Sequence, residues 1–389
     1  MVQVLRNLIQ VVPSLPPAFG GVGDFCVKLW EHWPEPKPQW RFLVTKGAAA
    51  SQAQWSEVKI AEFEKSIKGL VTALEQVNPQ TVVLHYVGYG FHPKGCPIWL
   101  PKALKEWKTV SSDRRVVVMF HELYATGPLW SSSFWVKLTA KKIIRDLILV
   151  ADLWLTSCSR YQSELVNNFA ANVKKGALIP VGANILAVEP VNFSHPWPLV
   201  VGEKLKVVIF GLAKTRLWAL NVHAKLLKSL CDRGWVESIT LAGTSGLDAK
   251  ATREMAQRRA DIGHAHLWHE AFDLTASQVS QLLATQDLGL VGNQLDIVTK
   301  SGTFAALSTH GVLSAICSKR NLAGNDLEKS VFLYDNTSKL TLKCLETKIQ
   351  NEQEVYQKKQ ALQTLMQTSI SWKTITLGWF KHLEQLDNL

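Results

Sequence analysis

Short apolar runs rich in β-branched residues alternate with helical patterns along most of this chain, and this alternation limits the possible folds more than any other feature. The helical patterns include residues 56–77 and 130–149. Apolar strands separated by helices are typical of a parallel sheet covered on both faces. We therefore expect the α/β fold class. In the first half of the chain, the expected strands cover residues 8–12, 40–44, 81–87, 115–120, 151–157 and 177–182.

The alternation stops at an irregular, proline-bearing stretch and then begins again, which predicts two domains. A chain of 389 residues is also too long for one typical core. We expect domains at 1–185 and 205–370, a linker at 186–204, and a C-terminal helix at 371–389 that returns to the first domain. Ligands of such sheets bind beyond the carboxyl ends of the strands. The strands expected in the second domain cover residues 206–210, 237–243, 264–268, 287–292, 311–316 and 331–334.

The charge balance favours an anionic partner. Lys and Arg number 43 against 32 Asp and Glu, a formal net charge of +11. This suits a phosphorylated substrate, a lipid surface or nucleic acid, although a merely basic soluble protein has the same balance. No nucleic-acid-binding motif is visible and the cations are dispersed, so we expect no nucleic-acid partner. Six cysteines without a C-x-x-C pair indicate no metal framework, and the lack of a signal peptide or long apolar span predicts a cytoplasmic protein.

A glycine-rich turn follows the first expected strand, at a place where α/β proteins approach phosphates. Gly20, Gly21 and Gly23 lack Cβ atoms, and Asp24 opens the helical pattern behind them. Backbone N–H groups can therefore come close to an anion at the positive end of a helix. The spacing matches neither G-x-G-x-x-G nor the Walker loop, so an ordinary turn is the alternative interpretation.

A series of short motifs follows in a fixed order over most of the chain. They are P-x-x-G-G-V-G at 17–23, FHE at 120–122, ADLWLTSCSRYQSEL at 151–165, IPVGAN at 179–184, IFGLAKTR at 209–216, TLAGTSG at 240–246 and KSGTFAALSTHGVLSAI at 300–316. In this order they resemble the GT-B-fold nucleotide-sugar glycosyltransferases of the large retaining family that includes bacterial mannosyl- and glucosyltransferases. The resemblance implies two Rossmann-like, doubly wound domains that face a central cleft. The N-terminal domain would bind the acceptor and the C-terminal domain the nucleotide sugar.

The resemblance also implies an activity and the residues that perform it. The activity is retaining transfer of a hexose from a nucleotide diphosphate sugar to a lipid or glycan acceptor at the cytoplasmic side, with no metal and no cofactor besides the donor. His121 is the implied catalytic residue, and the segment from His269 to Phe272 is the implied contact for the base. The alternatives are a satisfied strand-end histidine and, for the cations, solvated loop charges. The implied donor-binding residues are Gly20, Gly21, Gly23, Lys214, Arg216, Ser301, Gly302 and Thr303.

The sequence departs from the family at two acidic positions. The family's E-x7-E pair falls near Val298 and on Ala306, and neither residue is acidic. The alternative function is therefore a catalytically impaired GT-B protein that binds nucleotide sugar or glycan without turnover. Nearby polar or flexible candidates for the donor are Gly292, Asn293, Gln294, Asp296 and Lys300.

The segment 130–150 has a basic face that suits an anionic membrane surface. Lys137, Lys141 and Arg145 recur at i, i+4 and i+8, and a basic face with aromatic neighbours is typical of helices that lie on anionic lipid. The alternative is an ordinary amphipathic helix with a solvated basic face. The aromatic neighbours are Trp130, Phe134 and Trp135.

Overall fold

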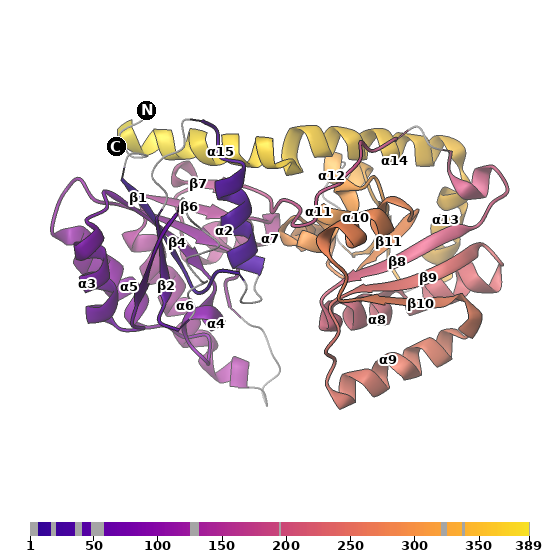
Figure 1. The fold of residues 1–389 in the computed structure, drawn as a ribbon, viewed down its shortest axis with the longest axis horizontal. Coiled ribbons are helices and arrows are strands. Elements are labelled where there is room, and N and C mark those ends of the chain that lie inside the picture. The colour runs from indigo at the N-terminus through magenta and orange to yellow at the C-terminus, as the bar shows by residue number, and fades with distance from the viewer. Residues whose placement is uncertain are drawn as a thin grey trace. The chain divides into compact units, whose positions relative to one another are not determined.

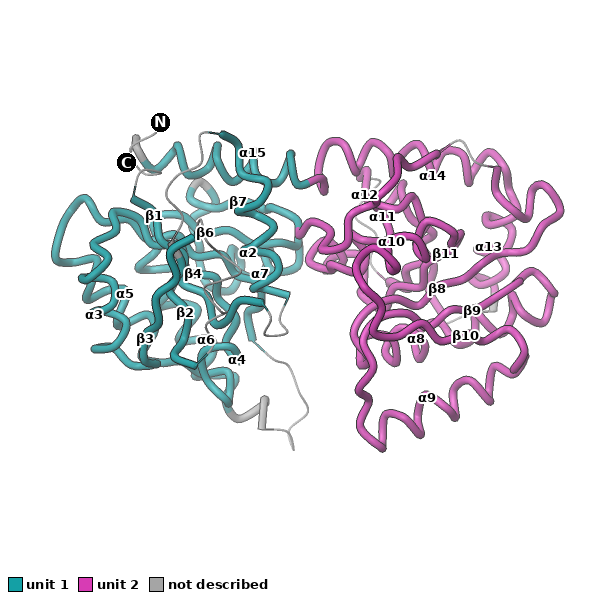
Figure 2. The backbone as a smooth tube through the Cα atoms, in the orientation of Figure 1, with its two compact units in different colours: residues 1–180, 372–389 teal, residues 181–371 magenta. Residues whose placement is uncertain are grey.

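The structure, a computed structural model, divides into two compact α/β units (Figure 2). Unit 1 comprises Met1–Pro180 and Trp372–Leu389, and unit 2 comprises Val181–Ser371. Each unit is described by itself below. The structure describes residues 7–16, 21–35, 41–47, 58–124, 132–193, 196–319, 325–336 and 339–388.

Unit 1 is built on a seven-stranded sheet in the order β3-β2-β1-β4-β5-β6-β7 (Figure 1). Its strands are β1 (Leu8–Val12), β2 (Arg41–Thr45), β3 (Lys59–Phe63), β4 (Thr81–Tyr86), β5 (Arg115–Phe120), β6 (Leu153–Thr156) and β7 (Gly176–Leu178). All neighbouring pairs are parallel. The strand order reverses direction between β1 and β4, which is the topological switch point of a doubly wound sheet. The helices are α2 (Gly21–Glu31), α3 (Ile67–Val77), α4 (Gly88–Phe91), α5 (Trp99–Thr109), α6 (Ser132–Val150), α7 (Ser159–Phe169), η2 (Val173–Lys175), α15 (Trp372–Glu384) and η7 (Gln385–Asn388).

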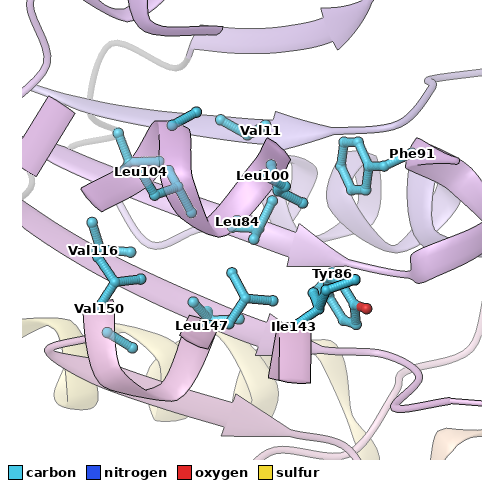
Figure 3. Packing of buried hydrophobic residues seen from close by; sticks show 14 of the residues in the cluster. Val11, Leu84, Tyr86, Phe91, Leu100, Leu104, Val116, Ile143, Leu147 and Val150 are labelled. Carbon is cyan, nitrogen blue, oxygen red and sulfur yellow. The ribbon is translucent and has the colours of Figure 1, made fainter. Parts of the chain in front are cut away.

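The sheet of unit 1 packs against α5 and α6 through apolar side chains (Figure 3). Leu84 on β4, Leu104 on α5 and Leu147 on α6 are all fully buried. The strands are apolar on both faces because helices cover both, which is why they read as unbroken hydrophobic runs. Truncating one of these leucines to alanine is expected to cost about 2–5 kcal/mol of unfolding free energy.

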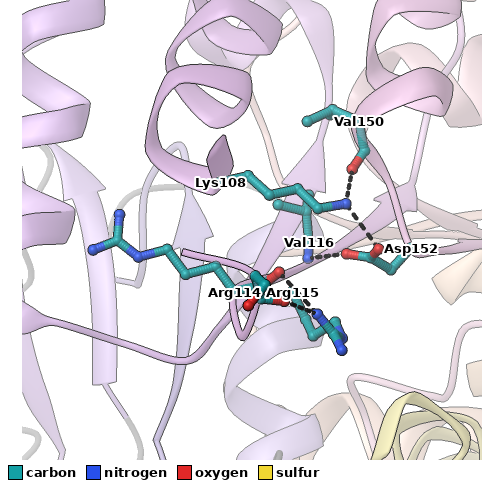
Figure 4. A network of polar contacts seen from close by, with 7 residues as sticks. Lys108, Arg114, Arg115, Val116, Val150 and Asp152 are labelled. Atoms are coloured by element: carbon teal, nitrogen blue, oxygen red, sulfur yellow. Dashed lines mark hydrogen bonds and ion pairs between the residues drawn. The ribbon is translucent and has the colours of Figure 1, made fainter. Parts of the chain in front are cut away.

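A polar clasp holds the amino ends of β5 and β6 together (Figure 4). Lys108 donates to the carbonyl oxygen of Val150 and to Oδ1 of Asp152, both at 2.8 Å. Oδ2 of Asp152 accepts from the backbone N–H of Val116 at 2.8 Å. The clasp fixes where α6 ends and where β6 begins.

Unit 2 repeats the plan with a six-stranded parallel sheet in the order β10-β9-β8-β11-β12-β13. Its switch point lies between β8 and β11. The strands are β8 (Leu205–Gly211), β9 (Val236–Gly243), β10 (Trp268–Phe272), β11 (Leu288–Val291), β12 (Leu313–Cys317) and β13 (Phe332–Tyr334). The helices are α8 (Ala213–Asp232), α9 (Ala249–Ile262), α10 (Ala276–Ala284), α11 (Gly302–Thr309), α12 (Asp326–Lys329), α13 (Lys339–Gln350) and α14 (Glu352–Leu365), with short turns η3 (Pro198–Val200), η4 (Ala265–Leu267), η5 (Leu295–Lys300) and the π-helical η6 (Met366–Ile370). The prediction of an α/β protein with two doubly wound sheets is confirmed.

Two element predictions were wrong. Residues 59–63 form strand β3 and not the start of a helix, because α3 begins only after Ser66, whose hydroxyl accepts from the N–H of Gly69. The strand expected at 264–268 begins at Trp268, because His264 adopts φ 56° and the chain turns through η4 first.

Two segments at the borders of the units pack locally. Residues 186–204, for which we expected a linker, belong to unit 2, and Trp197 is buried there with its ring 6.0 Å from that of Phe332. Helix α15 belongs to unit 1, where Trp372 lies 5.5 Å from Phe25. Within the described ranges, no helix has the length and apolarity needed to cross a bilayer.

Candidate functional site

The carboxyl edge of the unit 2 sheet brings two predicted phosphate-binding segments together. Strand β8 ends at Gly211, where φ is +129°, and a Cβ atom there would lie 2.7 Å from Oγ1 of Thr303. Only glycine tolerates both that backbone angle and that contact. The turn that carries Lys214 therefore lies directly against the first turn of α11, at the topological switch point of the sheet.

Both helices present backbone N–H groups at this edge. The N-cap residue of α8 is Leu212, which has no side-chain hydrogen bond to the first turn. In α11 the Ser301 hydroxyl caps the N–H of Phe304 at 3.3 Å. A Cβ atom on Gly302 would meet only Oδ1 of Asn184, at 3.8 Å, so this turn is open. The first N–H groups of a helix have no partner within the helix and carry partial positive charge, so two such ends at one edge attract an anion.

Lys214 and Arg216 occupy different environments. Lys214 is exposed on the first turn of α8, whereas the Arg216 side chain is only 2% exposed. The guanidinium of Arg216 donates to the carbonyl oxygens of Gly211 and, at 2.7 Å, Thr244, and it stacks 4.5 Å from the ring centre of Phe272. Burial lowers the pKa of Arg216, and the nearby Asp273 and Glu270 oppose the shift. Arg216 thus joins the ends of β8, β9 and β10 beneath the edge.

Arg216 thus acts as one clamp on the strand ends at this edge. A second clamp includes Asp273, which the sequence analysis missed. Asp273 has φ 55° and follows β10 directly, and its Oδ1 accepts from the N–H of Ser245 at 2.9 Å. Hydrogen bonds from Ser245 lower the pKa of Asp273, and Arg216 nearby adds to the effect. Gly243 is equally constrained, because its Cβ would lie 2.1 Å from the oxygen of Gly211. Asp is one of the few non-glycine residues that adopt a positive φ, but β10 (WHEAF) lacks an apolar pattern, so no clear sequence signal marked Asp273.

The two predicted base contacts do not lie together. Phe272 ends β10 at the carboxyl edge, but His269 is exposed three residues earlier, about 10 Å back along the strand. His264 contacts Asp232 at 2.9 Å, and its ring centre lies 6.3 Å from that of His266. Among the residues that the structure describes, no group of three ligands is arranged to hold a metal ion.

The positions of the missing glutamates lie in the core of unit 2. Val298 and Ala306 are both fully buried in an apolar cluster. The nearby Asn293 and Asp296 are also buried, at 8% and 4% exposure, whereas Gln294 is exposed. No carboxylate therefore takes the place of either family glutamate at its own position.

In unit 1, His121 belongs to a buried chain of polar side chains. Nε2 of His121 lies 3.0 Å from Nδ1 of His85, and Nε2 of His85 lies 2.6 Å from Oε1 of Gln10. Because the amide oxygen accepts, His85 carries its proton on Nε2 and accepts from His121 through Nδ1. Burial holds the pKa of His85 well below its usual value, and the neighbouring His121 adds to the effect. His85 is therefore neutral and fixes the direction of the His121 ring.

Aromatic rings cover this polar chain. Phe25 lies edge-on to His121 at 5.2 Å, and Trp379 of α15 stacks on His85 at 5.8 Å. Gly23 packs tightly, since its Cβ would lie 2.7 Å from the oxygen of Ser14, while Gly21 faces open space. Gly20 lies outside the described residues.

The predicted basic face of residues 130–150 is divided between half-buried and exposed positions of α6. Lys137 and Lys141 are half-buried, with Nζ atoms 5.8 and 5.3 Å from the ring centre of Tyr124. Lys142 and Arg145 are exposed. Trp130 and the side chains of Phe134 and Trp135 lie outside the described part of the chain.

Solved structures with low sequence identity match nearly the whole chain. HepE from Anabaena in complex with UDP is 12% identical, with a TM-score of 0.66 over 97% of this chain and 100% of its own. Sucrose-phosphate synthase from Thermosynechococcus elongatus is 10% identical, with a TM-score of 0.68 over 98% and 99%. A glycosyltransferase from Rickettsia africae is also 10% identical, with a TM-score of 0.67 over 97% and 98%. No protein-family model and no curated protein matches the chain.

The chain has the GT-B fold. The architecture that the motifs implied is therefore confirmed. At identities of 10–12% the likeness defines the fold alone. GT-B neighbours include a Listeria monocytogenes protein assigned as a UDP-N-acetylglucosamine 2-epimerase, with a TM-score of 0.57, so the function must be argued from the site itself.

Proposed function

We propose that this protein transfers a hexose, with retention, from a nucleotide diphosphate sugar to a lipid or glycan acceptor. The observation that carries the proposal is the meeting of two helix N-termini and Lys214 at the switch point of unit 2, enforced by Gly211 against Thr303. Such an edge neutralises a leaving diphosphate with backbone dipoles and one cation, and it needs no metal to do so. The GT-B neighbours that were crystallised with UDP and UDP-glucose support the same ligand class.

In the proposed donor site, Lys214 and the N–H groups of α8 and of Gly302 and Thr303 contact the diphosphate. Arg216 has a positioning role, because its guanidinium is occupied by carbonyl oxygens and by the ring of Phe272. It holds the β8 and β9 turns at the spacing that the diphosphate requires. Phe272 ends the strand that precedes the base-contacting loop, and its role toward the base, like that of His269, stays a prediction.

His121 is the proposed catalytic residue of unit 1. A neutral His85 accepts its Nε2–H and so orients the ring without adding charge. An imidazole held in this way hydrogen-bonds a hydroxyl of the donor sugar and places the anomeric carbon for reaction.

A second function is favoured by one specific observation. Val298 and Ala306 are buried apolar residues at the positions of the family's two glutamates. If those carboxylates are indispensable, the protein binds nucleotide sugar without turning it over.

Thermal unfolding with UDP, GDP and ADP and their sugars, followed by an assay for donor hydrolysis, separates the two functions. Binding to the folded state stabilises it by RT ln(1 + [L]/Kd), so one nucleotide should raise Tm. Turnover of the matching donor supports transfer, and tight binding with no turnover supports the second function. No stabilisation by any nucleotide contradicts both.

We also propose that the protein works at the cytoplasmic face of an anionic membrane. The support is a stripe on α6 formed by Leu138, Lys142, Arg145 and Leu149, whose two leucines are 80% and 77% exposed. On the neighbouring α5, Lys102 and Lys105 are also exposed. Exposed leucines between cations suit a lipid head-group region, where each nearby cation contributes about 1 kcal/mol. This stripe replaces the face first expected from Lys137, Lys141 and Arg145.

A further inference from the structure

A cavity of ≈ 320 Å³ lies in unit 1 beyond the carboxyl end of β5. Its walls come from α4, from the residues that follow β5, and from α6 and α7. Glu122, the residue after His121, is part of the lining. The volume is at the lower end of the range for small-molecule sites, which suits a compact ligand. Further lining residues are Tyr89, Lys94, Tyr124, Lys137 and Tyr161.

Two lysines line this cavity and a third lies next to them, and no acidic partner of the three is found among the described residues. Lys137 and Lys94 line it, and Lys141 shares with Lys137 the ring of Tyr124. None of the three makes an ion pair with any residue that the structure describes. Glu164 on α7 instead accepts from the Tyr124 hydroxyl and, at 2.6 Å, from Asn168. A cation over a tyrosine ring gains about 0.5–1 kcal/mol, which leaves the ammonium groups able to bind an anion.

The other lining groups suit a saccharide. The tyrosine rings offer flat apolar faces with polar rims, which is how proteins contact sugar rings. Glu122 offers carboxylate oxygens to sugar hydroxyls.

We propose that this cavity binds the acceptor, and that the acceptor is a saccharide or polyol bearing a phosphate or carboxylate. The anionic group lies between Lys94 and Lys137, with Lys141 behind, and the sugar ring lies against the tyrosines with its hydroxyls toward Glu122. This inference rests on the proposed glycosyl transfer, because it assigns the acceptor of that reaction. It also gives Lys137 and Lys141 a ligand-binding role, in place of the membrane contact first expected of them.

The test is a calorimetric titration of the whole protein without nucleotide. Glucose 6-phosphate and glucuronate carry the anion, and glucose is the neutral reference. Glucose 6-phosphate should bind at least about 10-fold more tightly than glucose, since a charge-assisted hydrogen bond to phosphate is worth that much or more. Lys137→Gln with Lys141→Gln should remove most of this preference. The control is Lys59→Gln with Lys68→Gln, which removes the same charge from exposed positions of unit 1 outside this cavity and should leave the preference unchanged.

Several outcomes would overturn the proposal. Equal affinity for glucose and glucose 6-phosphate would show that the cavity does not select charge, and an equal loss in the control variant would show attraction to the general surface field only. Absence of binding by all three probes would reject the site outright. Vesicles containing phosphatidylinositol, a lipid-borne polyol phosphate, show whether the acceptor is linked to a lipid or free. If the protein binds these vesicles more tightly than it binds free glucose 6-phosphate, and this binding depends on Lys137, the acceptor is lipid-linked. Nucleotide binding to unit 2 is measured separately, so a failure here is distinguishable from a failure of the donor proposal.

Discussion

In unit 1, the carboxyl half of the sheet holds a dry chain of side chains, Gln10, His85 and His121, beneath Phe25 and Trp379. In unit 2, the equivalent edge holds glycines, open helix N-termini and an exposed lysine. The same strand order thus supports two kinds of chemistry. A buried histidine pair in which His85 is neutral suits the orientation of uncharged hydroxyls, and a glycine-lined edge of backbone donors suits a polyanion.

The largest expected effect concerns the clamp beneath the unit 2 edge. Arg216→Ala should lower the unfolding free energy by about 3 kcal/mol, because it removes a buried side chain and leaves the part-buried carbonyls of Gly211 and Thr244 without this donor. Denaturant unfolding measures this. Lys225→Ala, at an exposed position of the same helix, should change stability by less than about 0.5 kcal/mol. Equal stability of the Arg216 variant and the wild type would show that the hydrogen bonds of Arg216 do not stabilise this edge.

The next effect concerns the histidine chain. His121→Ala should reduce turnover of the donor by about 10²-fold, the scale of a lost positioning group, while nucleotide affinity stays unchanged. His266→Ala, an exposed histidine in unit 2, is the matched control. Full turnover in the His121 variant would show that His121 is an ordinary strand-end histidine. The buried histidine chain of unit 1 would then have no role in catalysis.

The pH dependence of stability sharpens the contrast. His85 has a folded pKa well below its usual value, and burial lowers the pKa of His223 in unit 2 to about 4. Below about pH 6.5 the unfolded chain binds protons that the folded state does not, so stability should fall as pH falls, by up to about 1.4 kcal/mol per pH unit for each histidine. Unfolding between neutral pH and about pH 5 should show a shallower slope for His85→Gln than for wild type. An unchanged slope would mean that His85 is not held neutral in the fold.

The smallest effect concerns the membrane. Lys142→Gln with Arg145→Gln should weaken co-sedimentation with anionic vesicles by about 1 kcal/mol per cation at low salt. Lys137→Gln with Lys141→Gln should weaken it less, because those side chains are half-buried against Tyr124. A larger loss of vesicle binding in the Lys137/Lys141 variant than in the Lys142/Arg145 variant would favour the membrane face first expected from the sequence.

Much of the fold was predictable because β4, β5 and β8 are continuous apolar runs. Strand β3 was missed because KIAEF lies at the sheet edge with little burial, so it lacks that pattern. On α6, helical spacing correctly predicts that Ile143 and Leu147 face the core and that Arg145 is exposed. It does not predict the half-burial of Lys137 and Lys141, because Tyr124, which they contact, comes from another segment. The burial of Arg216 was not predictable, because the carbonyls and the ring that hold it come from strands far away in the sequence.

The central claim is that the carboxyl edge of unit 2 binds a nucleotide diphosphate. The most direct measurement is calorimetric titration with UDP, or with whichever nucleotide stabilises the protein most, into the wild type, Lys214→Ala and Lys225→Ala. We predict saturable 1:1 binding by the wild type, at least about 10-fold weaker binding by Lys214→Ala, and wild-type affinity for Lys225→Ala. Equal affinities of all three proteins, or no binding by the wild type, would contradict the account.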